Sequence, residues 1–151
     1  MRIGIISDTH GLLRPEALTA LAGVEHILHA GDVGRIEILA ELRAIAPVTA
    51  IRGNIDRDGA CAELPETEMI ELGGRIFYLV HAIEDLDISP RAAGVDVVVF
   101  VHSHRPSVEQ RGDVLYLNPG SAGPRRFQLP ITLALVAISD SGVEAHIEAL
   151  L

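Results

Sequence analysis

The chain has 151 residues, a length typical of one domain with its own core, and we expect a single domain over residues 1–151. Hydrophobic residues make up 48% of the chain but aromatic residues only 3%, so aliphatic side chains must build the core. The formal net charge of −9 argues against general nucleic-acid binding, because phosphate backbones are bound by clustered lysine and arginine.

The sequence also bears on the cellular compartment. Cys61 is the only cysteine, which excludes an intrachain disulfide. The apolar run before Asp8 is too short for a signal peptide. No apolar stretch approaches the roughly 20 residues needed to cross a bilayer. We therefore expect a soluble, cytoplasmic protein that does not bind membranes.

The first third of the chain alternates predicted strands with predicted helices. Residues 2–8, 26–32 and 48–54 are apolar runs typical of buried strands. Residues 15–23 and 35–45 have apolar side chains at helical spacing, and Pro15 lies near the first turn of the earlier helix. This alternation predicts right-handed crossovers and a parallel sheet that is buried on both faces.

The remainder of the chain is dominated by predicted hairpins. Their turns are expected at Gly73-Gly74, Arg111-Gly112-Asp113 and Ser141-Gly142. Between the first and second hairpins, a short helix near Pro90–Gly94 is followed by a valine-rich strand at 95–101. Two packed sheets with helices outside are therefore expected, and the sequence contains no internal repeat or linker.

Polar side chains gather where the predicted strands end. In parallel sheets, ligand and catalytic groups gather outside the carboxyl ends of the strands. The residues at these positions are Asp8, His10, Asp32, Asn54, His81, His102 and His104. Taken alone, each pair is explained equally well by an ordinary strand-end turn or loop, whereas the whole set predicts a shared site. Gly31 and Gly53 precede two of these residues, where a side chain would crowd such a site.

The chemistry of these seven side chains indicates that they bind metal ions. On an extended chain, His102 and His104 project from the same face, because side chains alternate with a period of two. Seven nitrogen and oxygen ligands exceed the four that a tetrahedral zinc ion takes. They suit two divalent ions that share a bridging carboxylate, an arrangement that can clamp a displacement at phosphorus.

Six motifs occur in a recognisable order: DTHG, HAGDVG, RGNID, VH, VHSH and NPGSAGPR. Together they resemble the calcineurin-like metallophosphoesterase superfamily, and most closely its small single-domain prokaryotic phosphodiesterases, the YfcE-like branch. The resemblance extends from Arg2 to about Arg126. It implies an α/β fold, a four-layer α/β/β/α sandwich of two mixed sheets flanked by helices, with a dinuclear centre between the sheet edges.

The resemblance also implies a ligand scheme in which Asp32 bridges two ions. It assigns to one ion Asp8, His10, Asp32 and His104, and to the other Asp32, Asn54, His81 and His102. Among these ligands we assign catalytic roles to Asp32, Asn54 and His81. Manganese is the ion that the family commonly uses; iron, zinc, cobalt and nickel also occupy such sites, and mixed ligation does not select among them.

Ile55 is the main departure from the pattern of the family, which often has histidine there as the proton donor to the leaving oxygen. Because general acid catalysis contributes about 10²–10⁴-fold, we expect a preference for aryl or other acidic leaving groups. Ala82 and Val101 stand where glycine is usual, and Ser103 where threonine is usual.

Residues outside the ligand set have weaker assignments. Arg125, its neighbour Arg126, Arg52 and Asn118 are candidates for substrate binding, while surface ion pairs or a plain turn would explain them equally. Asp56 is either an acceptor that orients a ligand or its loop, or a solvated turn residue. His29 is expected to pack beneath the site instead of binding metal.

The predicted function is that of a metal-dependent phosphoesterase, most consistent with a phosphodiesterase of small-molecule substrates. In this hypothesis a water shared by the two ions would lose a proton, and the hydroxide would attack phosphorus in line. One alternative is a non-catalytic interaction scaffold, since the superfamily includes a retromer subunit of this fold. A nuclease is a second alternative, which the lack of a basic surface disfavours. An exposed strand edge would allow a homodimer.

Overall fold

The computed structural model describes residues 1–101 and 103–151, and its first sheet is built from both ends of the chain. The sheet consists of β1 (Arg2–Ile6), β2 (His26–His29), β3 (Val48–Ala50), β9 (Thr132–Ser139) and β10 (Gly142–Ala149). The strand order is β10-β9-β1-β2-β3. β1, β2 and β3 run parallel, as expected, and β9 and β10 add an antiparallel edge.

The second sheet is also mixed and contains the two other predicted hairpins. Its strands are β4 (Thr67–Leu72), β5 (Arg75–Val80), β6 (Val97–Val99), β7 (Ser107–Arg111) and β8 (Val114–Asn118), in the order β4-β5-β6-β8-β7. β5, β6 and β8 are parallel, so the carboxyl ends of β5 and β6 lie at the same edge. All three predicted hairpins are confirmed.

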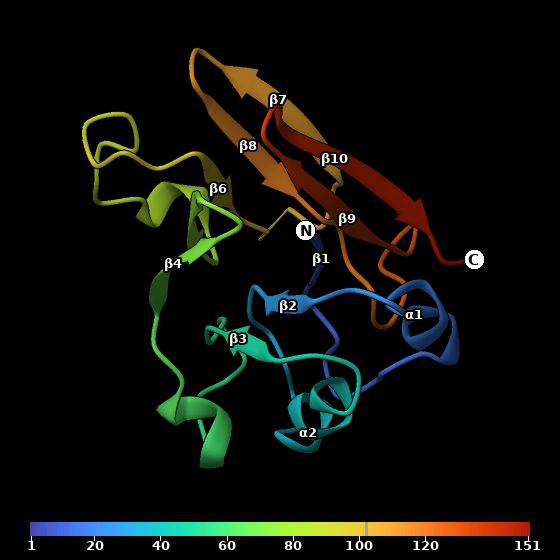
Figure 1. Ribbon diagram of the computed structural model, residues 1–151. Helices are drawn as coiled ribbons and strands as arrows, with labels where there is room; N and C mark the ends of the chain where they lie inside the picture. Colours follow the sequence, from blue (N-terminus) through green and yellow to red (C-terminus); the bar gives the residue numbers. More distant parts are fainter. Residues whose placement is uncertain (102) are drawn as a thin grey trace.

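The helices cover the outer face of the first sheet (Figure 1). α1 (Pro15–Ala20) begins at its proline, and α2 (Glu37–Arg43) buries Ile38, Leu39 and Leu42. The other helical segments are the 3-10 turns η1 (Gly59–Glu63) and η2 (Ile83–Asp85). No helix in the described part of the chain has the length and hydropathy needed to cross a membrane.

The expected helix near Pro90–Gly94 is wrong. This segment makes a single turn, in which the Ala93 amide donates to the Ser89 carbonyl and the Val95 amide donates to the Pro90 carbonyl. The next residues enter β6 at once, so a second helical turn has no room. The outer layer of the second sheet is instead built by η2 and the loop after it, whose apolar side chains Ile83, Leu86 and Ile88 pack against the sheet.

The main core lies between the two sheets. Ile3 and Ile5 of β1 meet Phe77 and Leu79 of β5 there, and all four side chains are fully buried. Ile6 faces the opposite way, toward the helices, as alternation along a strand requires. This double burial holds the ends of β1 and β5 at fixed positions, and these strand ends carry candidate ligands.

Phe77→Ala should lower the free energy of unfolding by about 3–5 kcal/mol, because it removes the largest fully buried side chain from the core. Urea denaturation measures the loss. Met69→Ala on the adjacent β4 is the matched control, since Met69 is 45% exposed and its removal should change stability by less than about 0.5 kcal/mol. Equal losses in the two variants would contradict this description of the core.

Candidate metal centre

The main chain places Asp8 and Asp32 side by side. Hydrogen bonds between the parallel strands β1 and β2 continue beyond the strand ends. The Asp8 amide donates to the Gly31 carbonyl at 3.0 Å, and the His10 amide donates to the Asp32 carbonyl at 2.9 Å. The two carboxylates therefore emerge at the same edge of the sheet, which confirms the expectation from the strand-end pattern.

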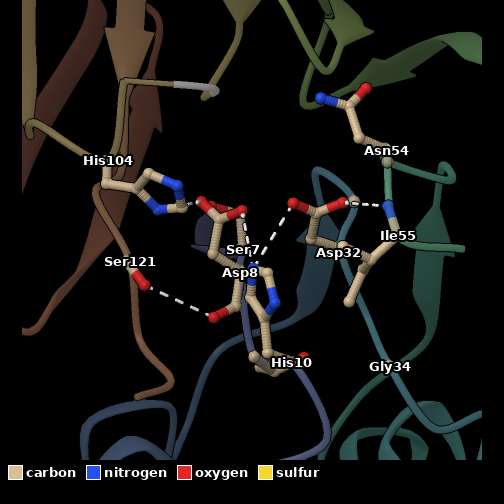
Figure 2. Close-up of polar contacts among 12 residues, drawn as sticks. Ser7, Asp8, His10, Asp32, Gly34, Asn54, Ile55, His104 and Ser121 are labelled. Atoms are coloured by element: carbon tan, nitrogen blue, oxygen red, sulfur yellow. Dashed lines mark hydrogen bonds and ion pairs between the residues drawn. The ribbon is translucent and has the colours of Figure 1, made fainter. Parts of the chain in front are cut away.

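Three imidazoles surround these carboxylates. The Nε2 atom of His10 lies 3.4 Å from Asp32 Oδ2 and 3.7 Å from Asp8 Oδ1, so its ring stands between the two acids (Figure 2). His81 Nε2 lies 3.3 Å from Asp32 Oδ2, and His104 Nδ1 lies 3.3 Å from Asp8 Oδ2. Five of the seven predicted ligands are thus brought together, from the ends of both sheets.

The donor atoms at this site fit a metal ion. Asp8 Oδ1 and His104 Nδ1 are buried and have no hydrogen-bond partner among the described atoms. The Nδ1 atom of His81 lies 2.9 Å from the Ala30 carbonyl, a contact that orients the ring with Nε2 toward Asp32. Asp8, Asp32 and His81 each offer one ligand atom, and these atoms all lie within 4.8 Å of one another.

The backbone is strained at these residues. Among the described residues other than glycine, positive φ occurs at Asp8 (55°), His10 (46°), Asp32 (56°) and His104 (60°), and also at Phe127 (54°). This conformation is rare in non-glycine residues, and it clusters at ligand-binding sites where the surrounding structure enforces it. Four of the five positions are predicted ligands, so the strain marks the site independently of side-chain chemistry.

The two glycines expected to make room for the site do so. A Cβ atom at Gly53 would collide with the carboxylate and amide of Asp32. A Cβ atom at Gly31 would lie 2.8 Å from His81 Nδ1, and the φ angle of +105° there also disfavours a side chain. Both positions therefore require glycine if Asp32 and His81 are to approach.

The charges of the site are tightly coupled. Asp32 and then Asp8 raise the pKa of His10 to about 9. Burial opposes ionisation of both carboxylates, but the neighbouring histidines outweigh it and lower the pKa of Asp8 and of Asp32. Burial likewise opposes a charge on His81, and the contact with Asp32 still raises its pKa. The carboxylates are therefore ionised and demand compensating positive charge.

The two remaining predicted ligands are less well defined. The side chain of Asn54 is exposed and lies on the opposite side of Asp32 from His104 (Figure 2). Ile55, the next residue, donates its amide hydrogen to Asp32 Oδ1 at 3.1 Å. His102 lies outside the described residues. A ligand role for either residue is therefore still a prediction.

Asp56 orients the loops instead of the ligands themselves. Its side chain is buried and accepts hydrogen bonds from the amides of Val33 (3.1 Å), Gly34 (3.1 Å) and Gly53 (2.9 Å). These bonds join the loop that carries Asp32 to the loop that carries Asn54. The alternative of a solvated turn residue is excluded by its 3% exposure.

Asn118, a candidate for substrate binding, has a structural role in the fold. The residue is fully buried, and its amide group donates to the Val101 carbonyl at 3.0 Å while accepting from the Gly120 amide at 2.9 Å. Because both ends of the amide are engaged inside the protein, Asn118 fastens the loop beyond β6 to the end of β8.

The predicted arginines form hydrogen bonds or ion pairs with neighbouring protein groups. Arg52 donates to the Ala62 carbonyl at 2.9 Å and forms an ion pair with Glu66 at 2.7 Å. Arg125 donates to the Leu129 carbonyl at 3.2 Å. Arg126 contacts a candidate ligand directly, since its Nη2 atom lies 3.3 Å from His10 Nδ1. Which arginine of the Arg125-Arg126 pair turns inward is determined only by the folded loop.

Two serines support the site and were missed from the sequence. Ser7 Oγ lies 3.1 Å from Asp8 Oδ2 and 2.9 Å from the Gly120 carbonyl. Ser121 donates to the Asp8 carbonyl at 3.3 Å (Figure 2). The only signal in the sequence was their position beside DTHG and within NPGS. The NPGS segment therefore supports the Asp8 turn through Ser121.

His29 packs beneath the site, as predicted. It is fully buried, with Nε2 3.1 Å from the Thr9 hydroxyl and Nδ1 accepting from the Gly31 amide at 3.2 Å. Burial lowers its pKa to about 4, so the ring is neutral at physiological pH. Its contacts connect the two loops that carry Asp8 and Asp32.

Comparison with known proteins assigns the chain to a family. A profile of the calcineurin-like phosphoesterase superfamily domain matches residues 1–141. The chain belongs to this superfamily. It is 36% identical over 151 residues to a probable metallophosphoesterase of Methanothermobacter thermautotrophicus, covering 89% of this chain and 85% of that protein. It is 26% identical to phosphodiesterase YfcE of Escherichia coli K12, covering 97% of each.

Solved structures confirm the fold. A structure described as a novel archaeal phosphodiesterase aligns with a TM-score of 0.79 at 24% identity, covering 98% of this chain and 100% of the other. Wild-type Vps29 of Entamoeba histolytica, solved in complex with zinc, aligns with a TM-score of 0.75 at 23% identity over the full length of both chains. The expected metallophosphoesterase fold of two mixed sheets is thus confirmed.

The neutral state of His29 predicts acid sensitivity. Its folded pKa of about 4 lies below the unfolded value of about 6.5, so protonation favours unfolding, and stability is lost as pH falls from about 6.5 toward 4. This loss approaches about 3 kcal/mol. His29→Asn, whose amide oxygen can still accept from Gly31, should be less stable at pH 7 but lose less stability over that interval. Urea denaturation of chelator-treated protein between pH 4.5 and 7 measures the difference, and parallel pH profiles would contradict the prediction.

Proposed function

We propose that this protein is a metal-dependent phosphodiesterase with two divalent cations at the Asp8–Asp32 edge. The observation that carries the proposal is the position of Asp32 Oδ2, which lies 3.4 Å from His10 Nε2 and 3.3 Å from His81 Nε2. A single carboxylate oxygen between two imidazoles from different sheets suits a ligand shared by two ions. Membership of the phosphoesterase superfamily supports the same chemistry.

The ligand scheme proposed from the family pattern agrees with the groups seen together. One cation would be held by Asp8, His10, Asp32 and His104, and the other by Asp32, Asn54, His81 and His102. Manganese is the proposed ion. When bound, such cations polarise a phosphoryl group and activate water for attack at phosphorus.

The residues of the chain set the charge and position of the substrate. Asp8 and Asp32 bring two negative charges against four from two divalent ions, so a loaded site keeps positive charge that attracts a phosphate ester. Arg126, in contact with His10, adds a cation at the same place. Displacement of protons from His10 should accompany metal binding, because its pKa is about 9 and a ligand nitrogen must be deprotonated.

The leaving group must depart with little help from the protein. Ile55 is 45% exposed beside Asp32 and cannot donate a proton. Small-molecule diesters with acidic alcohol groups are therefore the proposed substrates. We also propose a cytoplasmic location, and homodimer formation is still a prediction.

A non-catalytic scaffold is the competing function, because one fold neighbour is Vps29. The strained ligand loops and the cluster of two carboxylates and three imidazoles favour the enzyme, since a scaffold needs neither. The acidic net charge of −9 disfavours a nuclease.

Asp32→Ala should abolish hydrolysis of bis(p-nitrophenyl) phosphate and remove metal from both positions at once, because the shared ligand is lost. Elemental analysis and an assay with added Mn²⁺ measure the two effects. Asp113→Ala, an exposed aspartate in the β7–β8 turn, is the matched control and should retain metal and activity. Full metal content and activity in Asp32→Ala would disprove the scheme. A wild-type protein that is fully loaded but inactive would favour the scaffold.

Ile55→His should place a proton donor beside the departing oxygen. Turnover of a methyl or ethyl diester should rise by about tenfold or more, while turnover of bis(p-nitrophenyl) phosphate changes little, since general acids assist poor leaving groups most. The measurement is the ratio of kcat values for the two substrates. Ile55→Gln, polar but unable to act as a proton donor, is the control, and an equal gain there would argue against acid catalysis.

A further inference from the structure

Phe127 has an unusual position for an aromatic residue in a chain with so few. Its side chain is 93% exposed, and its φ angle is +54°, a conformation that costs free energy in a bulky residue. Burial in the core cannot explain a ring that contacts so little protein. Among the described residues, the four other non-glycine positions with positive φ are all candidate metal ligands.

The surroundings of Phe127 form a hollow with a cationic wall. A cavity of about 610 Å³ is lined by Arg105, Phe127, Gln128 and Leu129. Arg105 follows His104 directly in the chain, and Arg126, which precedes Phe127, contacts His10 at 3.3 Å. The hollow is therefore lined by the chain neighbours of His104 and of Arg126, the arginine that contacts His10.

The opposite flank of the centre has a different character. A cavity of about 450 Å³ beside Asn54 and His81 is lined by three carboxylates, Glu66, Asp85 and Asp87. Arg52 also lines it but is paired with Glu66. An anionic substituent would be repelled from that flank and attracted to the flank with Arg105 and Arg126.

We propose that the Phe127 hollow binds a planar aromatic group of the substrate, such as an aryl ring or a nucleobase, stacked on the Phe127 ring. Arg105 and Arg126 bind the phosphoryl oxygens next to it. The proposal rests on phosphate binding at the centre described above and adds the class of substituent. An exposed ring can stack on any flat π-system, so the subsite selects aromatic over aliphatic groups without requiring one particular base.

The test compares phenylphosphonate with methylphosphonate by calorimetric titration into Mn²⁺-loaded protein. Neither compound has an ester bond to hydrolyse, so the result does not depend on turnover. The wild type should bind phenylphosphonate about tenfold more tightly. Equal affinities, or no binding of either compound, would overturn the proposal. Preference for phenylphosphonate in a protein that fails to hydrolyse diesters would support the subsite and reject only the catalytic function.

The choice of variants separates binding from folding. Phe127→Gly relieves the positive φ, so its melting temperature should not fall, yet the preference for phenylphosphonate should disappear while methylphosphonate affinity is unchanged. Phe127→Tyr should keep the preference. Arg105→Gln should lower both affinities about fivefold, because it acts on the phosphoryl group. Met69→Ala, which removes another exposed hydrophobic side chain, is the matched control and should alter neither affinity. A preference that persists in Phe127→Gly would overturn the assignment.

Discussion

Two carboxylates held side by side are the constraint on which the site depends. The hydrogen bonds that extend the β1–β2 pairing leave Asp8 and Asp32 no freedom to separate. Burial raises the cost of two adjacent negative charges, since like charges repel more strongly away from water. The surrounding histidines, His10 from the Asp8 loop and His81 and His104 from the second sheet, are therefore a requirement of the arrangement. Protons or metal ions can supply the positive charge, and the competition between them is built into the geometry.

The rigid core maintains the strained conformations of the site. Each positive-φ residue costs of order 1–3 kcal/mol, and four such residues meet at the site. Ile3 and Ile5 lie just before the Asp8 turn, and Phe77 and Leu79 lie just before His81, all fully buried between the sheets. Because these anchors cannot shift without opening the core, the loops beyond them keep conformations that they would not adopt alone. The buried Asp56 carboxylate adds a second restraint by holding the Asp32 and Asn54 loops together.

The positions of residues at strand ends could be predicted from the sequence. The partners of long side chains and the conformations of short turns could not. Asp8, Asp32 and His81 follow strands, so the rule for parallel strand ends located them without knowledge of the fold. The partners of Arg52 and Arg125 could not be predicted, because a guanidinium group reaches several neighbours, and Glu66 and the Leu129 carbonyl are brought close only by folding. Asn118 has the sequence context of a loop residue. It is the last residue of β8, and the loop to which it donates a hydrogen bond at Val101 buries it. At Pro90, a helix does not form because β6 begins only a few residues later, at Val97.

The distribution of charge around the centre matters more than its total. A net charge of −9 is a sound argument against binding a long phosphate backbone, which needs many cations along an extended surface. It says little about one phosphate group, because that group experiences mainly the charges within roughly 10 Å. Arg126 lies against His10, whereas Glu66, Asp85 and Asp87 lie on the His81 side. An anion approaching this edge meets attraction on one flank and repulsion on the other, so an acidic protein can still orient a small anionic ester in a single direction.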